Sequence, residues 1–400
     1  SFPIIQSSSI KNTKINFYLD KQNYINAFVT HGSKIFITTE LLMKSTNVHQ
    51  IAGVIAHEIG HITGGHLNKR ARAYEDSLFS TVLSSILAVG AIAAGQGQAG
   101  TAILLGGQHI SRQQALSFSR NQESYADQAA IKLVKKTNYS LKGMYEMFEI
   151  LERKERFSRI NPYLQTHPLS SERKKILKYH IDDDIKPNFD RKLEKRLSLI
   201  RAKLIGYTAK KDKFNIFFPS NKNTLESWYA RSIFLYLNGS IKESIMFIDK
   251  CIQSDKSNPY FYELKGQIYY ENGNAQMAIN NFEKALKIKK NEKHFFIALA
   301  KALYSSNDIK KFEKSIELLK KYIEKEEYPI EAWHYLGLCY GKMGDYFLSS
   351  LALTEKFLLL NDIKNAKLQL IKAKNNKAEI KKYDSRINDL TNIIKQRENK

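Results

Sequence analysis

The chain has 400 residues, 43% hydrophobic and 26% charged, which excludes global disorder and allows two or three domains with hydrophobic cores. Its 63 Lys and Arg residues outnumber its 40 Asp and Glu residues, giving a formal net charge of +23. The basic residues are spread along the chain, so they indicate either an acidic partner or a lysine-rich composition without functional meaning. An RNA-binding aromatic signature and zinc-finger spacing are both missing, so we expect no nucleic-acid partner.

Strand signals mark two short segments near the N-terminus. Residues 15–19 and 34–38 are rich in Ile and aromatic side chains, and a turn signal at 31–33 precedes the second segment. Residues 40–70 place apolar side chains at helical spacing, in Ile51, Val54, Ile55 and Ile59. We therefore expect a small sheet followed by helices.

Residues 77–111 form a long run without Lys, Arg, Asp or Glu. The pattern predicts two apolar helices joined by a Gly/Gln hinge at 95–100. Such a hairpin is either buried, or a mobile lid over a cleft, or a segment at a membrane interface. The run is short and Ser-rich for a membrane span, which favours the hairpin or lid.

Further helices are expected in four segments, 115–136, 140–160, 171–179 and 190–204. The polar stretch 206–224, with Gly206 and Pro219, is expected to be a linker. These boundaries define an N-terminal domain of residues 1–205.

From residue 225 onward the sequence repeats. The aromatic residues Trp228, Tyr262 and Trp333 are 34 and then 71 residues apart, and 71 is 34 plus 37. A period of 34 residues with this pattern of aromatic, Gly and Ala positions is typical of tetratricopeptide repeats. We expect residues 225–400 to form an α-solenoid of such repeats with a C-terminal cap, and to bind protein partners.

The segment His57-Glu58-Ile59-Gly60-His61 matches the HExxH pattern of zinc peptidases. Residues four apart share one face of a helix, so both imidazoles can bind one ion. Glu58 lies one step round the helix, beside the metal, where it can accept a proton from the attacking water. The segment therefore predicts a catalytic Zn²⁺ site.

A catalytic zinc ion needs a third protein ligand. His66 would lie about 180° from His57 if the helix continued, although Gly64-Gly65 could end the helix before it. We interpret His66 as a polar residue at the helix end. Glu75 is close in sequence but has no supporting partner.

Glu123 is the favoured third ligand. It opens an ExxxD pattern, so Glu123 and Asp127 share a helix face. Glu123 can bind the ion while Asp127 accepts a hydrogen bond from a ligand histidine. The alternative is that Glu123 is a solvated acidic side chain on the surface and binds no metal.

Four short blocks occur in a specific order: Asn26-Ala27-Phe28, His57 to His61, Glu123 to Asp127, and Thr166-His167-Pro168 followed by Arg173. Together they resemble the HtpX-like and CAAX-prenyl-protease-like gluzincin peptidases over about residues 20–180. That resemblance implies a zincin-type α+β domain. With the repeats added, the chain is similar to the periplasmic, repeat-containing branch of the family.

The resemblance implies a zinc metalloendopeptidase that acts on misfolded or unassembled envelope proteins. It also implies that the repeats recruit substrates or partners, including outer-membrane assembly machinery. A periplasmic location would follow removal of a signal peptide, in keeping with a sequence that starts at Ser1 rather than Met. A peripheral contact of the protein with a membrane surface remains an alternative.

Residue roles also follow from the resemblance. Asn26 and Ala27 would precede an edge strand, 34–38, that binds substrate in extended form. His167 would either stabilise the oxyanion or occupy the water position and hold the resting enzyme closed. Arg173 would orient His167 or Asp127, or lie on a helix surface. A Pro-Gly-Gly-like turn, frequent in the family, is replaced here by 29–33, which leaves the detail of the substrate edge open.

Two other classes of function compete with a peptidase. In one, the repeats act as an assembly factor or chaperone and the metal site is latent, although an intact Glu58 argues against a vestigial site. In the other, zinc is structural, which the ligand set disfavours because structural sites usually close with four Cys or His ligands.

Overall fold

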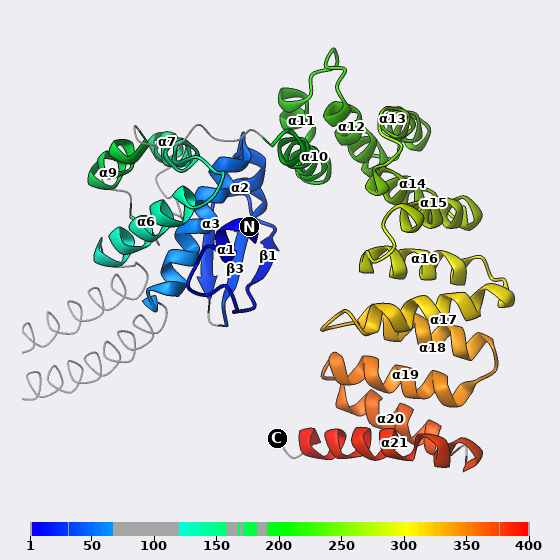
Figure 1. The fold of residues 1–400 in the computed structure, drawn as a ribbon. Helices are drawn as coiled ribbons and strands as arrows, with labels where there is room; N and C mark the ends of the chain where they lie inside the picture. Colours follow the sequence, from blue (N-terminus) through cyan, green and yellow to red (C-terminus); the bar gives the residue numbers. More distant parts are fainter. Residues whose placement is uncertain are drawn as a thin grey trace, which may run out of the picture. The chain divides into compact units, whose positions relative to one another are not determined.

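The computed structural model describes residues 2–30, 32–66, 120–157, 167–168, 171–181, 190–375 and 377–398. The chain divides into two compact units, residues 1–205 and 206–400, called here the N-terminal unit and the repeat unit. Figure 1 shows a small sheet packed with helices in the first and a ladder of stacked helices in the second. The predicted fold class, mainly helical with a small sheet and an α-solenoid, is confirmed.

The sheet has three strands, β1 (Asn16–Asp20), β2 (Ala27–Thr30) and β3 (Lys34–Thr38), in the order β1-β3-β2. β1 runs parallel to β3, and β2 runs antiparallel to it, with Ala27 opposite Ile37. The tight connection from β2 to β3 uses positive φ angles at Gly32 and Ser33. The segments expected as strands are β1 and β3, whereas β2 is too short to show an alternating pattern.

The expectation that 34–38 is the edge strand is wrong. β3 lies in the centre of the sheet, with β1 on one side and β2 on the other. Asn26 and Ala27 instead lead into β2, which forms an edge of the sheet among the described residues. The backbone N–H of Asn26 donates to Thr38 Oγ1 at 2.9 Å, and its carbonyl accepts from the Thr38 N–H at 3.0 Å.

The other described elements of the N-terminal unit are helices. They are α1 (Phe2–Gln6), α2 (Thr39–Lys44), α3 (Val48–Thr63), α6 (Arg120–Lys135), α7 (Leu141–Phe157), α9 (Ser171–Ile181) and most of α10 (Arg191–Thr208). Asn47 caps the start of α3, its side chain accepting the Gln50 N–H, and the helix ends before Gly64. Every side chain of α3 from residue 52 to 61 is buried. Figure 1 shows why: α3 lies between the sheet and the helices α6 and α7.

Two glycines of α3 let neighbouring helices approach closely. A Cβ atom at Gly60 would lie 2.7 Å from the carbonyl oxygen of Ala126 in α6. One at Gly53 would lie 2.6 Å from the Cβ of Met144 in α7. The Gly60 contact matters for function because Ala126 lies between Glu123 and Asp127 on α6.

The repeat unit consists of antiparallel helix pairs (Figure 1). The pairs are α12 (Leu225–Leu237) with α13 (Ile241–Ser254), α14 (Pro259–Glu271) with α15 (Ala275–Ile288), α16 (Lys293–Ser305) with α17 (Ile309–Ile323), α18 (Ile330–Lys342) with α19 (Tyr346–Leu359), and α20 (Ile363–Lys374) with α21 (Lys377–Glu398). Glycines allow two of these pairs to approach closely: a Cβ at Gly266 would lie 2.7 Å from the Phe282 ring, and one at Gly337 would lie 2.9 Å from Leu353 Cγ.

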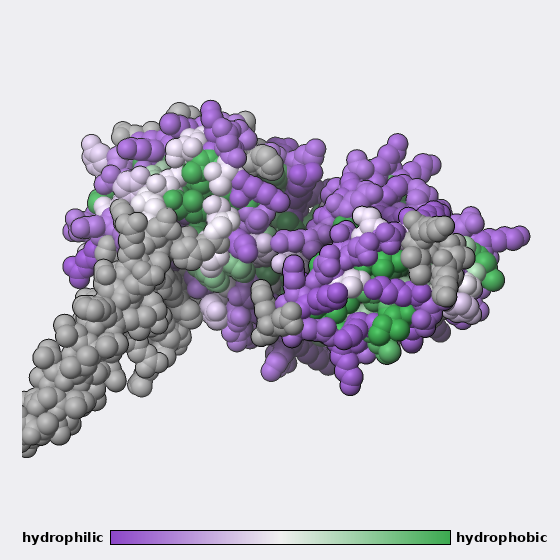
Figure 2. All heavy atoms as spheres, turned by 90° about the horizontal axis from the view of Figure 1, so that it is seen from below, coloured by the Kyte–Doolittle hydropathy of each residue, from purple (hydrophilic) through white to green (hydrophobic). Residues whose placement is uncertain are grey.

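Before these pairs, the segment 206–224 holds the last residues of α10 (Arg191–Thr208) and all of α11 (Lys211–Phe217). The proposed lid, 77–111, lies outside the described residues. No helix in the described ranges is both long and apolar enough to cross a membrane. On the face in Figure 2, hydrophilic residues dominate and hydrophobic residues gather in a few patches.

Candidate metal centre

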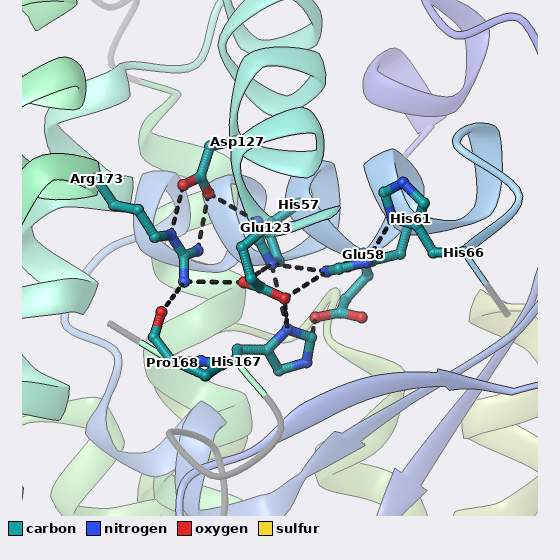
Figure 3. A network of polar contacts seen from close by, with 9 residues as sticks. All are labelled: His57, Glu58, His61, His66, Glu123, Asp127, His167, Pro168 and Arg173. Atoms are coloured by element: carbon teal, nitrogen blue, oxygen red, sulfur yellow. Dashed lines mark hydrogen bonds and ion pairs between the residues drawn. The ribbon is translucent and has the colours of Figure 1, made fainter. Parts of the chain in front are cut away.

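The two histidines of the HExxH segment face each other across one turn of α3. Their Nε2 atoms are 3.0 Å apart, and both side chains are buried. In Figure 3 both rings turn toward Glu123 and His167, which come from other parts of the chain. The helical spacing that suggested a shared ion therefore places the two ring nitrogens together.

Glu123 reaches the same point from the first turn of α6. Its carboxylate oxygens lie 3.4 Å from His57 Nε2 and 3.3 Å from His61 Nε2. The buried residues of α6 follow the spacing 123, 126, 127 and 130, so one face of the helix packs on α3 and carries Glu123 inward. The alternative of a solvated acidic side chain does not hold, because Glu123 is buried.

His167 completes the group from a separate segment. Its Nδ1 atom is 3.1 Å from Glu123 Oε1 and 3.4 Å from His57 Nε2. The side chain is fully buried, although it lies 110 residues from His57 in sequence. The structure thus gathers four potential ligand atoms, all within 4.8 Å of one another, from His57, His61, Glu123 and His167.

The spacing of these atoms suits a small tetrahedral ion. Bonds of about 2.0–2.1 Å in a tetrahedral zinc site put neighbouring ligand atoms about 3.3 Å apart. Five of the six pairs among these residues have donor distances of 3.0 to 3.4 Å, with Glu123 presenting Oε2 to His57 and Oε1 to His61 and His167, and the four ligand atoms all lie within 4.8 Å of one another. Two or three imidazoles with one carboxylate also form the donor set typical of catalytic zinc. The residues present therefore fit a metal ion.

Asp127 and Arg173 form a layer behind the metal-facing atoms. Asp127 Oδ1 is 2.9 Å from His57 Nδ1, which leaves Nε2 of that ring free for metal. Arg173 donates to both Asp127 oxygens at 2.6 and 2.9 Å, and its Nη1 lies 2.8 Å from Glu123 Oε2. The same Nη1 donates to the Pro168 carbonyl at 2.8 Å. Arg173 thus links both carboxylates to the segment that carries His167 (Figure 3).

Glu58 is buried without a hydrogen bond to either carboxylate oxygen from the described part of the chain. The Nε2 atom of His167 lies 3.6 Å from Glu58 Oε1. A buried carboxylate without partners is costly, so its presence requires an explanation. A general base that waits for a water molecule beside the metal supplies one.

The electrostatics favour positive charge at the centre of the cluster. Burial alone would raise the pKa of Glu123, but contacts with His167, His57 and His61 hold that pKa well below its usual range. Burial lowers the pKa of His57, yet hydrogen bonds to Asp127 and Glu123 outweigh it and raise the pKa to about 10. For His61, burial and the neighbouring histidines lower the pKa to about 3. A cation placed among these groups meets ionised carboxylates.

The pKa of Glu58 is shifted upward, in contrast to that of Glu123. Burial raises the pKa of Glu58 above its usual value, more than the nearby His167 and His57 lower it. A carboxylate with a raised pKa is a better proton acceptor near neutral pH. The burial that raises this pKa therefore suits Glu58 to acid–base catalysis.

His66, interpreted from the sequence as a polar residue at the helix end, lies just beyond α3, which ends at Thr63 before the Gly64-Gly65 pair. It is buried, and its Nδ1 atom lies 2.9 Å from Nδ1 of His61. The sequence interpretation did not include this contact, because it depends on the backbone path after the helix.

An HExxH helix, a carboxylate ligand from a second helix and a small sheet define a metallopeptidase domain. In agreement, residues 3–181 match Peptidase family M48, and residues 259–292 match the tetratricopeptide repeat. The chain therefore contains a family M48 metallopeptidase domain followed by tetratricopeptide repeats.

Several proteins are similar to this chain in sequence. The chain is 35% identical over 173 residues to the Beta-barrel assembly-enhancing protease of Escherichia coli (strain K12), an alignment that covers 42% of the chain and only 35% of that protein. The protein of that name from Yersinia pestis is 24% identical over 410 residues, covering 98% of the chain and 82% of the relative. Metalloprotease YcaL of E. coli (strain K12) is 27% identical over 187 residues, which cover 44% of the chain and 65% of YcaL.

Proposed function

We propose that the chain is a zinc-dependent endopeptidase. The observation that carries this proposal is the convergence of His57, His61 and Glu123 on one point, with the buried Glu58 carboxylate beside them and no hydrogen bond to it from the described residues. A structural zinc site would not need that buried base. The same observation disfavours a latent site in a scaffold protein.

A bound zinc ion would polarise the scissile carbonyl and lower the pKa of the attacking water. In the reaction, the Glu58 carboxylate accepts a proton from that water and then donates it to the leaving amine. Asp127 keeps a proton on His57 Nδ1, so His57 Nε2 keeps its lone pair. Arg173 holds Asp127 and Glu123 in place, so we assign it a positioning role rather than contact with substrate.

Asn26 and Ala27 are proposed to help form the substrate-binding edge of the sheet. Both are buried, and both lie at the start of β2. Asn26 Oδ1 is also buried without a hydrogen-bond partner in the described part of the chain. An edge strand can pair with an extended substrate through its backbone whatever the substrate sequence. We therefore propose that β2, rather than β3, is the edge strand that binds substrate.

The proposed substrates are misfolded or unassembled envelope proteins, and the proposed location is the periplasm after loss of a signal peptide. Support comes from the name of the E. coli and Y. pestis relatives, which are called β-barrel assembly-enhancing proteases. Backbone-directed binding at β2 also suits unfolded chains of varied sequence.

The repeat unit is proposed to recruit protein partners or substrates, including outer-membrane assembly machinery. A groove of about 560 Å³ between α15, α16 and α17 supports this role. Apolar side chains such as Phe296 line it together with five lysines and Glu283, which pairs with Lys314. One of the lysines, Lys325, has its Nζ 5.9 Å from the centroid of the Phe296 ring. An acidic polypeptide segment with an apolar side chain would complement this groove.

Metal removal tests the proposed activity. We expect the native chain to hold about one zinc ion and to cleave an unfolded outer-membrane β-barrel protein, and to lose cleavage when a chelator removes the ion. Added zinc should restore it. Elemental analysis and gel-based cleavage measure both quantities. Cleavage that persists in the metal-free chain would exclude a metal-dependent reaction.

His167 is proposed to occupy the open metal position and hold the resting site closed, because its Nδ1 lies among the ligand atoms. We expect His167→Ala to raise the cleavage rate about tenfold, the effect of destabilising a closed state by about 1.4 kcal/mol. Single-turnover cleavage measures the rate. A matched control is His294→Ala on an exposed position of α16. A fall in kcat for His167→Ala would instead assign it to oxyanion stabilisation.

A further inference from the structure

The side chain of His66 lies directly behind the metal-facing ring of His61. Its Nδ1 atom is 2.9 Å from His61 Nδ1, and the two rings meet edge to face with centroids 5.1 Å apart. His66 is 2% exposed, so water does not compete for this contact. In Figure 3 His66 lies on the side of His61 opposite Glu123. We propose that His66 is a positioning residue that holds His61 in its metal-binding tautomer.

The argument follows from where the proton of His61 must be. His61 Nε2 points at the cluster, 3.0 Å from His57 Nε2, so it must present a lone pair to an ion. Its proton then sits on Nδ1, which faces His66. For the 2.9 Å contact to be a hydrogen bond, His66 Nδ1 must accept that proton, and His66 must carry its own proton on Nε2.

The other ligand histidine is supported in the same way. His57 Nδ1 donates to Asp127, and His61 Nδ1 donates to His66. Each ring therefore has its tautomer set by a buried partner on the side away from the metal. The partners differ in chemistry: Asp127 is a carboxylate paired with Arg173, whereas His66 would accept through an imidazole nitrogen. His66 supports His61 without adding a third buried negative charge to the site.

The local backbone is built for this contact. Gly64 ends α3 at a φ of −77°, which any residue can adopt, and Gly65 follows at a φ of +63°, which favours glycine. A Cβ atom at Gly64 would lie 2.3 Å from His66 Nε2 and 2.7 Å from its Cε1. The two glycines thus turn the chain back and leave room for the His66 ring against the helix end.

The test measures zinc affinity of the full chain by competition with a chromophoric chelator. We expect His66→Leu to weaken zinc binding about 10- to 100-fold, as loss of an outer hydrogen bond to a ligand histidine does. His66→Asn should recover most of this loss, because the asparagine Oδ1 lies near the position of the histidine Nδ1 and can accept the same hydrogen bond. His294→Leu on the repeat unit is the matched control and should bind zinc as the native chain does.

Gly64→Ala gives a second route that keeps the imidazole. Since φ at Gly64 suits alanine, the main effect of the methyl group is to push the His66 ring away from His61. We expect a similar loss of zinc affinity. In a double-mutant cycle, Gly64→Ala should have little further effect once His66 is replaced by alanine.

The outcomes separate this inference from the proposed function on which it rests. Failure of the native chain to bind zinc would overturn the metal site itself. Zinc binding by native chain and His66→Leu alike would overturn the role of His66 alone. Equal losses in His66→Leu and His66→Asn would assign His66 to packing rather than to hydrogen bonding, and would also overturn the inference.

Discussion

Replacement of Glu58 by glutamine is expected to slow peptide hydrolysis by a factor of about 10² to 10⁴ while zinc binding persists. The amide has the same shape as the carboxylate but cannot accept a proton from water. Because neither Glu58 oxygen accepts a hydrogen bond from the described part of the chain, the substitution breaks no contact of that kind. It also removes a buried charge, so we expect no loss of stability. Initial rates on an unfolded substrate and zinc content per chain measure the two effects.

Glu152→Gln is the matched control for this prediction. Glu152 belongs to α7 of the same unit and pairs with Lys174 at 2.7 Å on the surface, so its replacement should change neither rate nor zinc content. Full activity of Glu58→Gln would identify another residue as the base. Retention of biological activity by a Glu58→Gln chain that no longer cleaves would instead favour an assembly factor whose repeats do the work.

Replacement of Arg173 by methionine is expected to lower the free energy of unfolding of the metal-free chain by about 3–5 kcal/mol. The guanidinium is 7% exposed and lies between Asp127 and Glu123, with contacts of 2.6 to 2.9 Å. Methionine has a similar length but leaves two buried carboxylates without their cation. Urea unfolding in the presence of a chelator measures the change. Arg173→Lys should recover only part of it, because an ammonium cannot bind Asp127 through a planar fork.

The neighbouring Lys174 supplies the control. Lys174→Met removes a charge from the same helix, but its pair with Glu152 is only partly buried, so the cost should stay below about 1 kcal/mol. A loss of less than about 1 kcal/mol in Arg173→Met would show that the site tolerates the two carboxylates without Arg173. That result would contradict the linking role assigned to Arg173 here.

Several features of this protein were determined by its sequence alone. The i, i+4 spacing of His57 and His61, and of Glu123 and Asp127, fixes which side chains share a helix face, because helical geometry is local. The 34-residue period likewise predicts the repeats, since each repeat packs mainly on its neighbours. Local periodicity is legible in a single sequence, so the metal-binding helices and the solenoid could be predicted with residue numbers.

Other features were decided by tertiary structure. The order of the sheet depends on pairing between strands, and the four-residue β2 gave no alternating signal, so β3 was wrongly assigned to the edge. The contact of Arg173 with both carboxylates joins segments 46 or more residues apart. The return of His66 to His61 depends on where α3 ends and on the backbone angles of two glycines. Such contacts arise from packing between distant segments and from backbone angles, and neither leaves a periodic trace in the sequence.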